Sequence, residues 1–258
     1  MMKEETLNSW EDFEKVLVEM NEKTKLLQGK VASCVNRVLF RGVSNTKYHL
    51  ESTIDRIQKG MCLSDYHGIV EIIHRHIETC TGRKWNLDTK VRLVGFELPA
   101  YEFMAYLRHN GFPSPLVDWT RSPYIAAFFA FRDVPSTVEY VSIFAYREYC
   151  REEGKSWQAD NPHIQTLGHT IATDYKHYLQ QSEYTICVKV QGTEIHFADY
   201  EDVKDKEEQE VLIKYNIPVS EQQKVLGQLD SMNITAYSLF GSEPSLMETL
   251  ALREIILK

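Results

Sequence analysis

The segment Phe40-Arg41-Gly42 places an arginine where a phosphate-binding side chain would be useful. The run before it, from Val31 to Phe40, is rich in β-branched and apolar residues, which is typical of a strand that ends in a turn at Arg41 and Gly42. A guanidinium fixed at a strand end can donate two parallel hydrogen bonds to phosphate oxygens, and a following glycine lets the backbone bend or lets a ligand approach. The alternative is an arginine that pairs with a surface carboxylate. Taken alone, these three residues favour the alternative.

A second cluster joins an acid, an aromatic ring and two hydroxyls in Asp118, Trp119, Thr120 and Ser122. It follows the helix-breaking Gly-Phe-Pro-Ser-Pro segment at 111–115 and precedes a strongly apolar helix. The start of a helix has free backbone N–H groups, which can bind an anion or be capped by a hydroxyl. The cluster could therefore bind a nucleotide, or Trp119 could belong to the core and Ser122 could be an N-cap.

Several kinds of site lack sequence support. Neither the P-loop pattern G-x-x-x-x-G-K-[ST] nor the dinucleotide-binding pattern G-x-G-x-x-G occurs in the sequence. His74 and His76 are two residues apart on a helix, so their side chains point about 200° apart and do not suit one metal ion. Five cysteines at wide spacings, without a C-x-x-C pair, disfavour a zinc ribbon and a disulfide framework. We predict no metal.

Composition narrows the class of protein. The chain has 258 residues, of which 43% are apolar, so it can bury a hydrophobic core. With 29 basic against 37 acidic residues, its net charge of −8 argues against nonspecific coating of nucleic acid. The N-terminus does not resemble a secretory signal, and no apolar run approaches the ~20 residues of a membrane span. We expect a reduced, cytoplasmic protein with no membrane partner.

The helices and strands that must position these residues do not follow a strict βαβ alternation. This order favours an α+β fold in a single domain. Apolar residues at helical spacing predict helices at 69–80, at 97–109 and after Pro123, with Ser122 as its N-cap. Ser220 and Gln223 suggest a capping box before another helix. The remaining predictions are a helical N-terminal element at 9–27, strands at 140–146, 184–190 and 211–217, a long irregular excursion at 151–181, an extended segment at 234–240 and a C-terminal helix at 244–258.

The two motifs together resemble the FRG-domain family, which is named for its Phe-Arg-Gly motif. Members typically read Q-H-Y-G-L-P-T-R-L-L-D-W-T-x-S-P at the second place, and this chain reads R-H-N-G-F-P-S-P-L-V-D-W-T-R-S-P at 108–123. The resemblance extends over roughly residues 30–245. The chain departs from the family at Arg108 in place of glutamine, at Asn110 in place of an aromatic residue, and at Ser114-Pro115 in place of Thr-Arg.

FRG motifs in turn resemble the Arg, Ser-Thr-Ser and Glu signatures of mono-ADP-ribosyltransferases. This resemblance implies a single domain over 1–258 with an ADP-ribosyltransferase-like split β-sheet core flanked by helices. The matching residues occur in the family's order: Arg41, the segment 120–122, and Glu210 before Val-Leu-Ile. Glu183, which follows Gln181-Ser182 at the start of another strand, is the reserve. Without the resemblance, the acidic run at 207–210 would be interpreted as a solvated rim.

The resemblance also implies roles for these residues, with NAD as co-substrate. Arg41 would hold the pyrophosphate, Ser122 or Thr120 would orient the nicotinamide ribose, and Glu210 would hydrogen-bond the ribose 2-OH. That last bond strengthens as the oxocarbenium-like transition state develops. The implied catalytic residues are thus Arg41, Ser122 and Glu210, and the implied cofactor-binding residues are Phe40, Gly42, Asp118, Trp119 and Thr120.

The function implied is transfer of ADP-ribose from NAD to a macromolecule, which could be RNA, DNA or protein. The family context suggests a toxin in bacterial anti-phage defence, restrained by an antitoxin or another inhibitory partner. Two alternatives stay open: a noncatalytic module that binds a nucleotide or a partner, and an NAD glycohydrolase. The basic and aromatic residues of 147–181 could bind single-stranded nucleic acid, but a solvated loop is the favoured interpretation.

Overall fold

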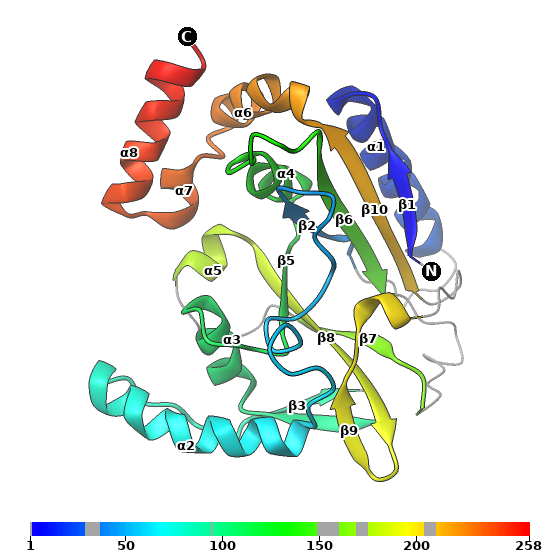
Figure 1. Ribbon diagram of the computed structural model, residues 1–258, viewed down its shortest axis with the longest axis vertical. Coiled ribbons are helices and arrows are strands. Elements are labelled where there is room, and N and C mark those ends of the chain that lie inside the picture. The colour runs from blue at the N-terminus through cyan, green and yellow to red at the C-terminus, as the bar shows by residue number, and fades with distance from the viewer. Residues whose placement is uncertain (1, 29–36, 94, 149–159, 169–174, 204–209) are drawn as a thin grey trace.

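A large mixed β-sheet flanked by helices organises the chain, and the computed structural model describes residues 2–28, 37–93, 95–148, 160–168, 175–203 and 210–258 (Figure 1). All pairings in this sheet are antiparallel except that of its first two strands. The strand order is β1 (Lys3–Thr6), β10 (Glu210–Pro218), β6 (Tyr140–Glu148), β2 (Leu39–Val43), β5 (Val117–Thr120), β8 (Ser182–Gln191) and β7 (His163–Gly168), and β9 (Glu194–Phe197) pairs with β8.

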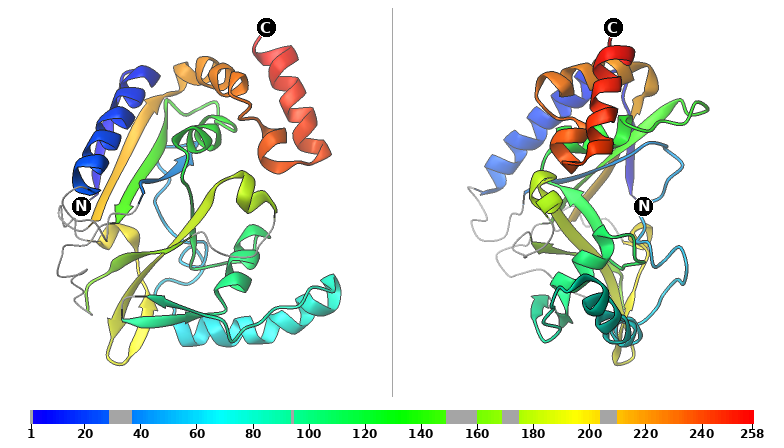
Figure 2. Two further views of the ribbon diagram at one scale, coloured as in Figure 1. Left: turned by 180° about the vertical axis from the view of Figure 1, so that it is seen from behind. Right: turned by 90° about the vertical axis from the view of Figure 1, so that its left-hand side faces the viewer.

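The helices gather in groups around this sheet. Figure 1 shows α1 beside β1 and β10, and α2 near β9 at the other end of the molecule. Figure 2 shows that α7 and α8 lie together beyond the sheet, with the C-terminus at the edge of the molecule. The bounds are α1 (Trp10–Gln28), α2 (Leu63–Thr81), α3 (Tyr101–His109), α4 (Pro123–Phe131), α5 (Tyr175–Leu179), α6 (Gln222–Ser231), α7 (Ala236–Phe240) and α8 (Glu243–Ala251), with a π-helical turn at Leu252–Ile256, 3₁₀ turns at Tyr200–Asp202 and Val219–Glu221, and a small separate sheet of β3 (Lys90–Leu93) and β4 (Phe96–Pro99).

Helix α4 lies directly against β2 because Gly42 has no side chain where the strand meets Ala126 and Ala130 of the helix. Ser122 caps the helix by accepting a hydrogen bond from the Ile125 backbone N–H at 3.3 Å. A β-carbon on Gly42 would lie 1.8 Å from the carbonyl oxygen of Ala126, so only glycine fits there. The close approach buries the apolar helix and fixes the distance between β2 and α4.

Strand β2 separates two hydrophobic clusters and thereby decides where Arg41 points. Phe40 packs among the residues of α1, α4 and α6, whereas Leu39 packs in a cluster with Trp119 and Tyr146. Successive side chains of a strand point to opposite faces. Arg41 therefore projects on the Trp119 side of the sheet, away from α4.

Much of the expected element order is confirmed. The N-terminal helix begins after Ser9, whose hydroxyl accepts a hydrogen bond from the Asp12 backbone N–H. The helix after Pro123 and the strands expected at 140–146, 184–190 and 211–217 are all present, as are the second and last helices with shifted ends. The sheet with flanking helices is a mixed α/β arrangement. The split core of an ADP-ribosyltransferase and the single domain over 1–258 stay predictions.

Other expectations are wrong. The segment expected to be extended at 234–240 contains helix α7, because the hydroxyls of Thr235 and Ser238 form a reciprocal capping box. The capping box expected from Ser220 and Gln223 is absent, since a 3₁₀ turn precedes α6 and Glu221 occupies the cap without a side-chain hydrogen bond.

Three boundaries also differ from those expected. The helix expected at 97–109 begins only at Tyr101, because strand β4 occupies 96–99. The excursion expected at 151–181 contains β7 and α5, and its residues 151–159 and 169–174 lie outside the described part. Arg41 lies within β2 rather than at its end. The part of the expected first strand at 31–36 also lies outside the described residues.

In the part of the chain that the structure describes, none of the helices combines the length and apolar character needed to cross a bilayer.

Candidate functional site

A cavity of about 390 Å³ opens where β2 and β5 meet. It is within the size range of small-molecule sites. Segment 44–62, which connects β2 to α2, supplies a further wall through Tyr48, His49 and Arg56. Six residues expected at the site line this cavity: Phe40, Arg41, Gly42, Asp118, Trp119 and Thr120. Residues separated by nearly eighty positions in the chain thus share one cavity.

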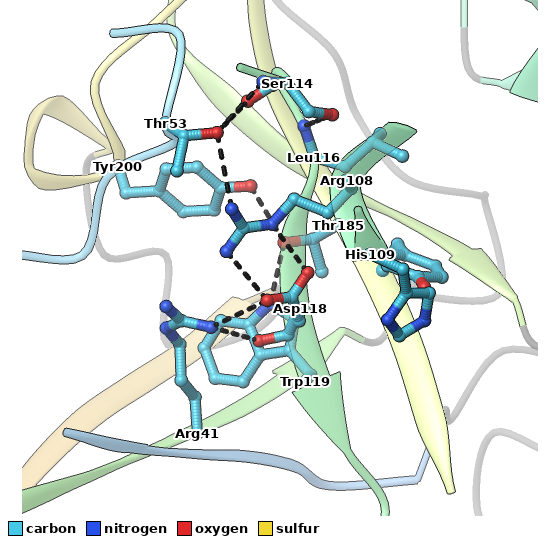
Figure 3. A network of polar contacts seen from close by, with 11 residues as sticks. Arg41, Thr53, Arg108, His109, Ser114, Leu116, Asp118, Trp119, Thr185 and Tyr200 are labelled. Carbon is cyan, nitrogen blue, oxygen red and sulfur yellow. Dashed lines mark hydrogen bonds and ion pairs between the residues drawn. The ribbon is translucent and has the colours of Figure 1, made fainter. Parts of the chain in front are cut away.

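The Arg41 guanidinium is held at one side and open at the other. Its Nη1 donates to the backbone carbonyl of Asp118 at 2.8 Å and lies 3.5 Å from the carboxylate Oδ2. Its Nε and Nη2 make no hydrogen bond with the described residues, and in Figure 3 the remaining nitrogens point away from Asp118. An arginine held in this way can donate to a ligand without first ordering its side chain.

Asp118 is occupied mainly by Arg108. Nε and Nη2 of Arg108 donate to the two carboxylate oxygens at 2.7 Å each (Figure 3). The third nitrogen, Nη1, donates to the Thr53 hydroxyl at 3.3 Å, and Thr53 in turn accepts from the Ser114 backbone N–H. This bidentate pair ties the end of α3 to β5 and to segment 44–62.

The charges at this point do not cancel. Burial raises the pKa of Asp118, but the nearby charges of Arg108 and Arg41 outweigh it, so the pKa of this carboxyl is below its ordinary value. Burial lowers the pKa of Arg41, Asp118 opposes that change, and the charges of Arg108 and Arg56 add to it. Arginine nevertheless stays protonated in proteins. Two guanidinium groups and one carboxylate leave an excess positive charge beside the cavity.

Segment 44–62 adds Arg56, the second arginine after Arg41 among the residues that line the cavity. Nε of Arg56 donates to Glu51 at 3.0 Å, and the two outer nitrogens of Arg56 make no hydrogen bond with the described residues. His49 from the same segment lies 2.6 Å from a Glu201 oxygen through its Nδ1. The cavity therefore has arginines on two walls, which suits a ligand with more than one phosphate group.

The aromatic and hydroxyl groups of the cavity are fixed from behind. The indole Nε1 of Trp119 donates to the buried Thr185 hydroxyl at 2.8 Å, and that hydroxyl shares a further hydrogen bond of 2.8 Å with Tyr200. Thr120 donates to the backbone carbonyl of Gln180 and accepts from the backbone N–H of Ser122. These contacts hold the Trp119 indole and the Thr120 hydroxyl in fixed positions beside the cavity.

The roles considered for Gly42 and Ser122 from sequence have structural explanations. Gly42 lines the cavity, but the space where its side chain would lie is filled by the backbone of α4. Ser122 caps α4 and is not among the cavity-lining residues.

Glu183 is not among the residues that line the cavity, and the side chain of Glu210 lies outside the described part of the chain. Glu183 is buried on β8, pairs in register with Trp119 on β5, and lies 3.6 Å from Nε of Arg121. Glu210 begins β10, and two strand spacings separate β10 from β2. Phe144 pairs with both Arg41 and Lys214, so the Glu210 backbone is offset from Arg41 by about 13 Å along the strands and about 10 Å across them.

Three cavity-related residues had no assigned role in the sequence. Arg108 was visible only as a departure from the family pattern, because its partner Asp118 lies on a different element and no spacing rule connects them. Arg56 lies in an irregular segment without a motif. His109 lines the cavity, and its Nε2 shares a hydrogen bond of 2.6 Å with the Tyr184 hydroxyl. Since burial raises the pKa of Tyr184, that hydroxyl stays protonated and can donate.

No group of three or more His, Cys, Asp or Glu side chains suited to a metal ion occurs among the residues described. The sequence prediction of a site without metal stays a prediction.

Comparison with protein families gives one match. The family model of the FRG domain matches residues 36–138, which supports the resemblance to that family over this segment. The matched residues include β2, segment 44–62, the Arg108–Asp118 pair and α4, whereas Glu183 and Glu210 lie outside it. Neither the curated proteins nor the solved structures gave a match.

Proposed function

We propose that this chain binds NAD in the Arg41 cavity and transfers ADP-ribose to a macromolecular acceptor. The observation that carries the proposal is the Arg41 guanidinium, which is anchored through Nη1 to Asp118 and has its other nitrogens available in a cavity that also contains Arg56. A diphosphate carries two adjacent charged groups, and two arginines that line one cavity can each donate to one of them.

The other cavity residues suit the rest of a dinucleotide. The exposed ring of Tyr48 is better placed to meet a planar base than that of Trp119, which is 3% exposed and packs against Tyr146, and the Ser182 hydroxyl could meet a ribose hydroxyl. Cleavage of the nicotinamide–ribose bond forms an oxocarbenium-like centre, which a carboxylate near the ribose stabilises. The proposal therefore needs a carboxylate that can reach this end of the ligand.

Of the two candidate glutamates, the geometry favours Glu183. Its strand adjoins β5, where Glu183 pairs in register with Trp119 and so shares the face of the sheet on which Arg41 projects, whereas Glu210 lies on a strand two positions from β2. For catalysis the Glu183 carboxylate would have to turn from Arg121 toward the ligand. The choice made from sequence, Glu210, becomes the reserve.

The test uses NAD labelled in its adenylate part, incubated with the full chain and a whole-cell extract. We expect label to enter the macromolecular fraction, and digestion with protease, ribonuclease or deoxyribonuclease to identify the acceptor class by releasing it. Glu183→Gln should reduce labelling at least about a hundredfold, because it removes the charge that meets the transition state. Glu194→Gln, an exposed change on β9, is the matched control and should label normally.

Two results would contradict parts of this proposal. If Glu210→Gln abolishes labelling and Glu183→Gln does not, the assignment of the glutamate is wrong. Rapid loss of NAD without any acceptor would identify a glycohydrolase instead of a transferase.

A second candidate, noncatalytic nucleotide binding, is favoured by one specific observation. Among the described residues that line the cavity, Asp118 alone has a carboxylate, and Arg108 occupies both its oxygens. A protein of this kind would bind NAD and release no nicotinamide with any extract. The same incubation, followed by chromatography of free nicotinamide, separates the two candidates. Restraint by an inhibitory partner, as expected for a toxin, is part of the transferase proposal only.

A further inference from the structure

Arg108 binds the Asp118 carboxylate more closely than Arg41 does, although only Arg41 lines the cavity. The two Arg108 contacts are 2.7 Å each, against 3.5 Å between Arg41 Nη1 and the nearer carboxylate oxygen. The shorter bond of Arg41, at 2.8 Å, goes to the Asp118 backbone carbonyl. Asp118 thus holds Arg41 largely through its main chain while its side chain faces Arg108 (Figure 3).

We infer that Arg108 is a positioning residue that keeps the charge of Arg41 available to an anionic ligand by occupying the Asp118 carboxylate. This inference rests on the proposed binding of a phosphate-bearing ligand beside Arg41. Arg108 acts through Asp118 and is not among the described residues that line the cavity.

The physical reason is competition for one guanidinium. Without Arg108, the Asp118 carboxylate would have Arg41 as its nearest cation, 3.5 Å away, and a ligand phosphate would have to displace it. With Arg108 present, each carboxylate oxygen already accepts a charge-assisted hydrogen bond. The three groups together then retain one positive charge, whereas Arg41 and Asp118 alone would be neutral.

Arg108 is itself prevented from turning toward a ligand. Its side chain is 15% exposed, and its remaining nitrogen donates to Thr53, which is fixed by the Ser114 backbone. The charge of Arg108 lowers the pKa of both Asp118 and Arg41, which is the effect expected of a cation held close to both groups.

The test measures binding of ADP-ribose, which cannot lose nicotinamide, by calorimetry on the full chain. Arg108→Gln keeps a hydrogen-bonding side chain but removes the charge, and we expect it to weaken binding at least about tenfold. The double variant Arg108→Gln with Asp118→Asn removes the competing carboxylate as well. Its net charge at the site equals that of the unmodified chain, so we expect affinity within about threefold of the original.

Arg108→Lys supplies a second measurement if Arg108→Gln does not fold. It keeps the charge without the bidentate geometry, and it should bind ADP-ribose within about threefold of the original chain. A purely structural role for Arg108 predicts instead that the double variant binds no better than the single one. That result, or undiminished binding by folded Arg108→Gln, would overturn the inference alone. No binding of ADP-ribose by the unmodified chain would overturn the proposed function, and the inference with it.

Discussion

The backbone of Gly42 lies so close to helix α4 that a β-carbon there would be 1.8 Å from the carbonyl oxygen of Ala126 and 2.7 Å from the nitrogen of Ala130. Both neighbours are backbone atoms, so no side-chain rotation could relieve the overlap. The glycine that follows Arg41 therefore sets the distance between the strand that carries this arginine and the helix behind it.

Replacement of Gly42 by alanine should destabilise the fold. The added methyl group must push α4 away from β2, and we expect the free energy of unfolding to fall by about 3 kcal/mol or more in urea titrations. Gly68→Ala is the matched control, because Gly68 lies in α2 with no atom near its β position, and it should raise stability by up to about 1 kcal/mol. Equal stability of Gly42→Ala and the original chain would show that α4 does not pack as described.

The sequence indicated local features well and through-space relationships poorly. Ser122 before Pro123 identified the start of α4 because the cap and the proline act within one turn. The Arg108–Asp118 pair could not be predicted, since it depends on how the end of α3 meets β5. Nor could the reason for Gly42, because it lies in the backbone of a helix more than eighty residues later.

The structure of segment 234–240 also depends on contacts that residue type alone does not reveal. Ile234, Tyr237 and Phe240 favour a strand by residue type. Thr235 and Ser238, however, satisfy each other's backbone N–H groups and start α7, which packs against α8. Capping chemistry and tertiary contact together outweigh the intrinsic preference of the apolar residues.

The Asp118 pair should give a defined dependence of stability on pH. Since the folded pKa of Asp118 is lowered, its contribution is fully present above the unfolded value near 3.9 and is lost as the pH falls through the folded value. We expect Asp118→Asn to be less stable than the original chain at pH 5 to 7, with the difference shrinking below about pH 4. Urea titrations across this range measure it. A difference that stays constant down to pH 2.5 would mean that Asp118 is not held ionised by the arginines.

The buried Thr185 hydroxyl should matter to stability because it serves two partners, Trp119 and Tyr200. Thr185→Val leaves both without this partner, and we expect a loss of about 1–3 kcal/mol in thermal or urea unfolding. In Thr79→Val the lost hydroxyl bonds only to a backbone carbonyl on the exposed part of α2, so its effect should be within about 0.5 kcal/mol. Similar losses in the two variants would contradict the importance of this contact.

The most direct measurement of the central claim is a calorimetric titration of NAD into the original chain and into Arg41→Lys, with Arg75→Lys as a control on the exposed side of α2. Lysine keeps the charge but loses the fork that holds both Asp118 and a phosphate. We expect saturable binding by the original chain and by Arg75→Lys, and affinity at least about tenfold weaker in Arg41→Lys. Equal affinity in all three proteins, or no binding by the original chain, would contradict the assignment of this cavity as a dinucleotide site.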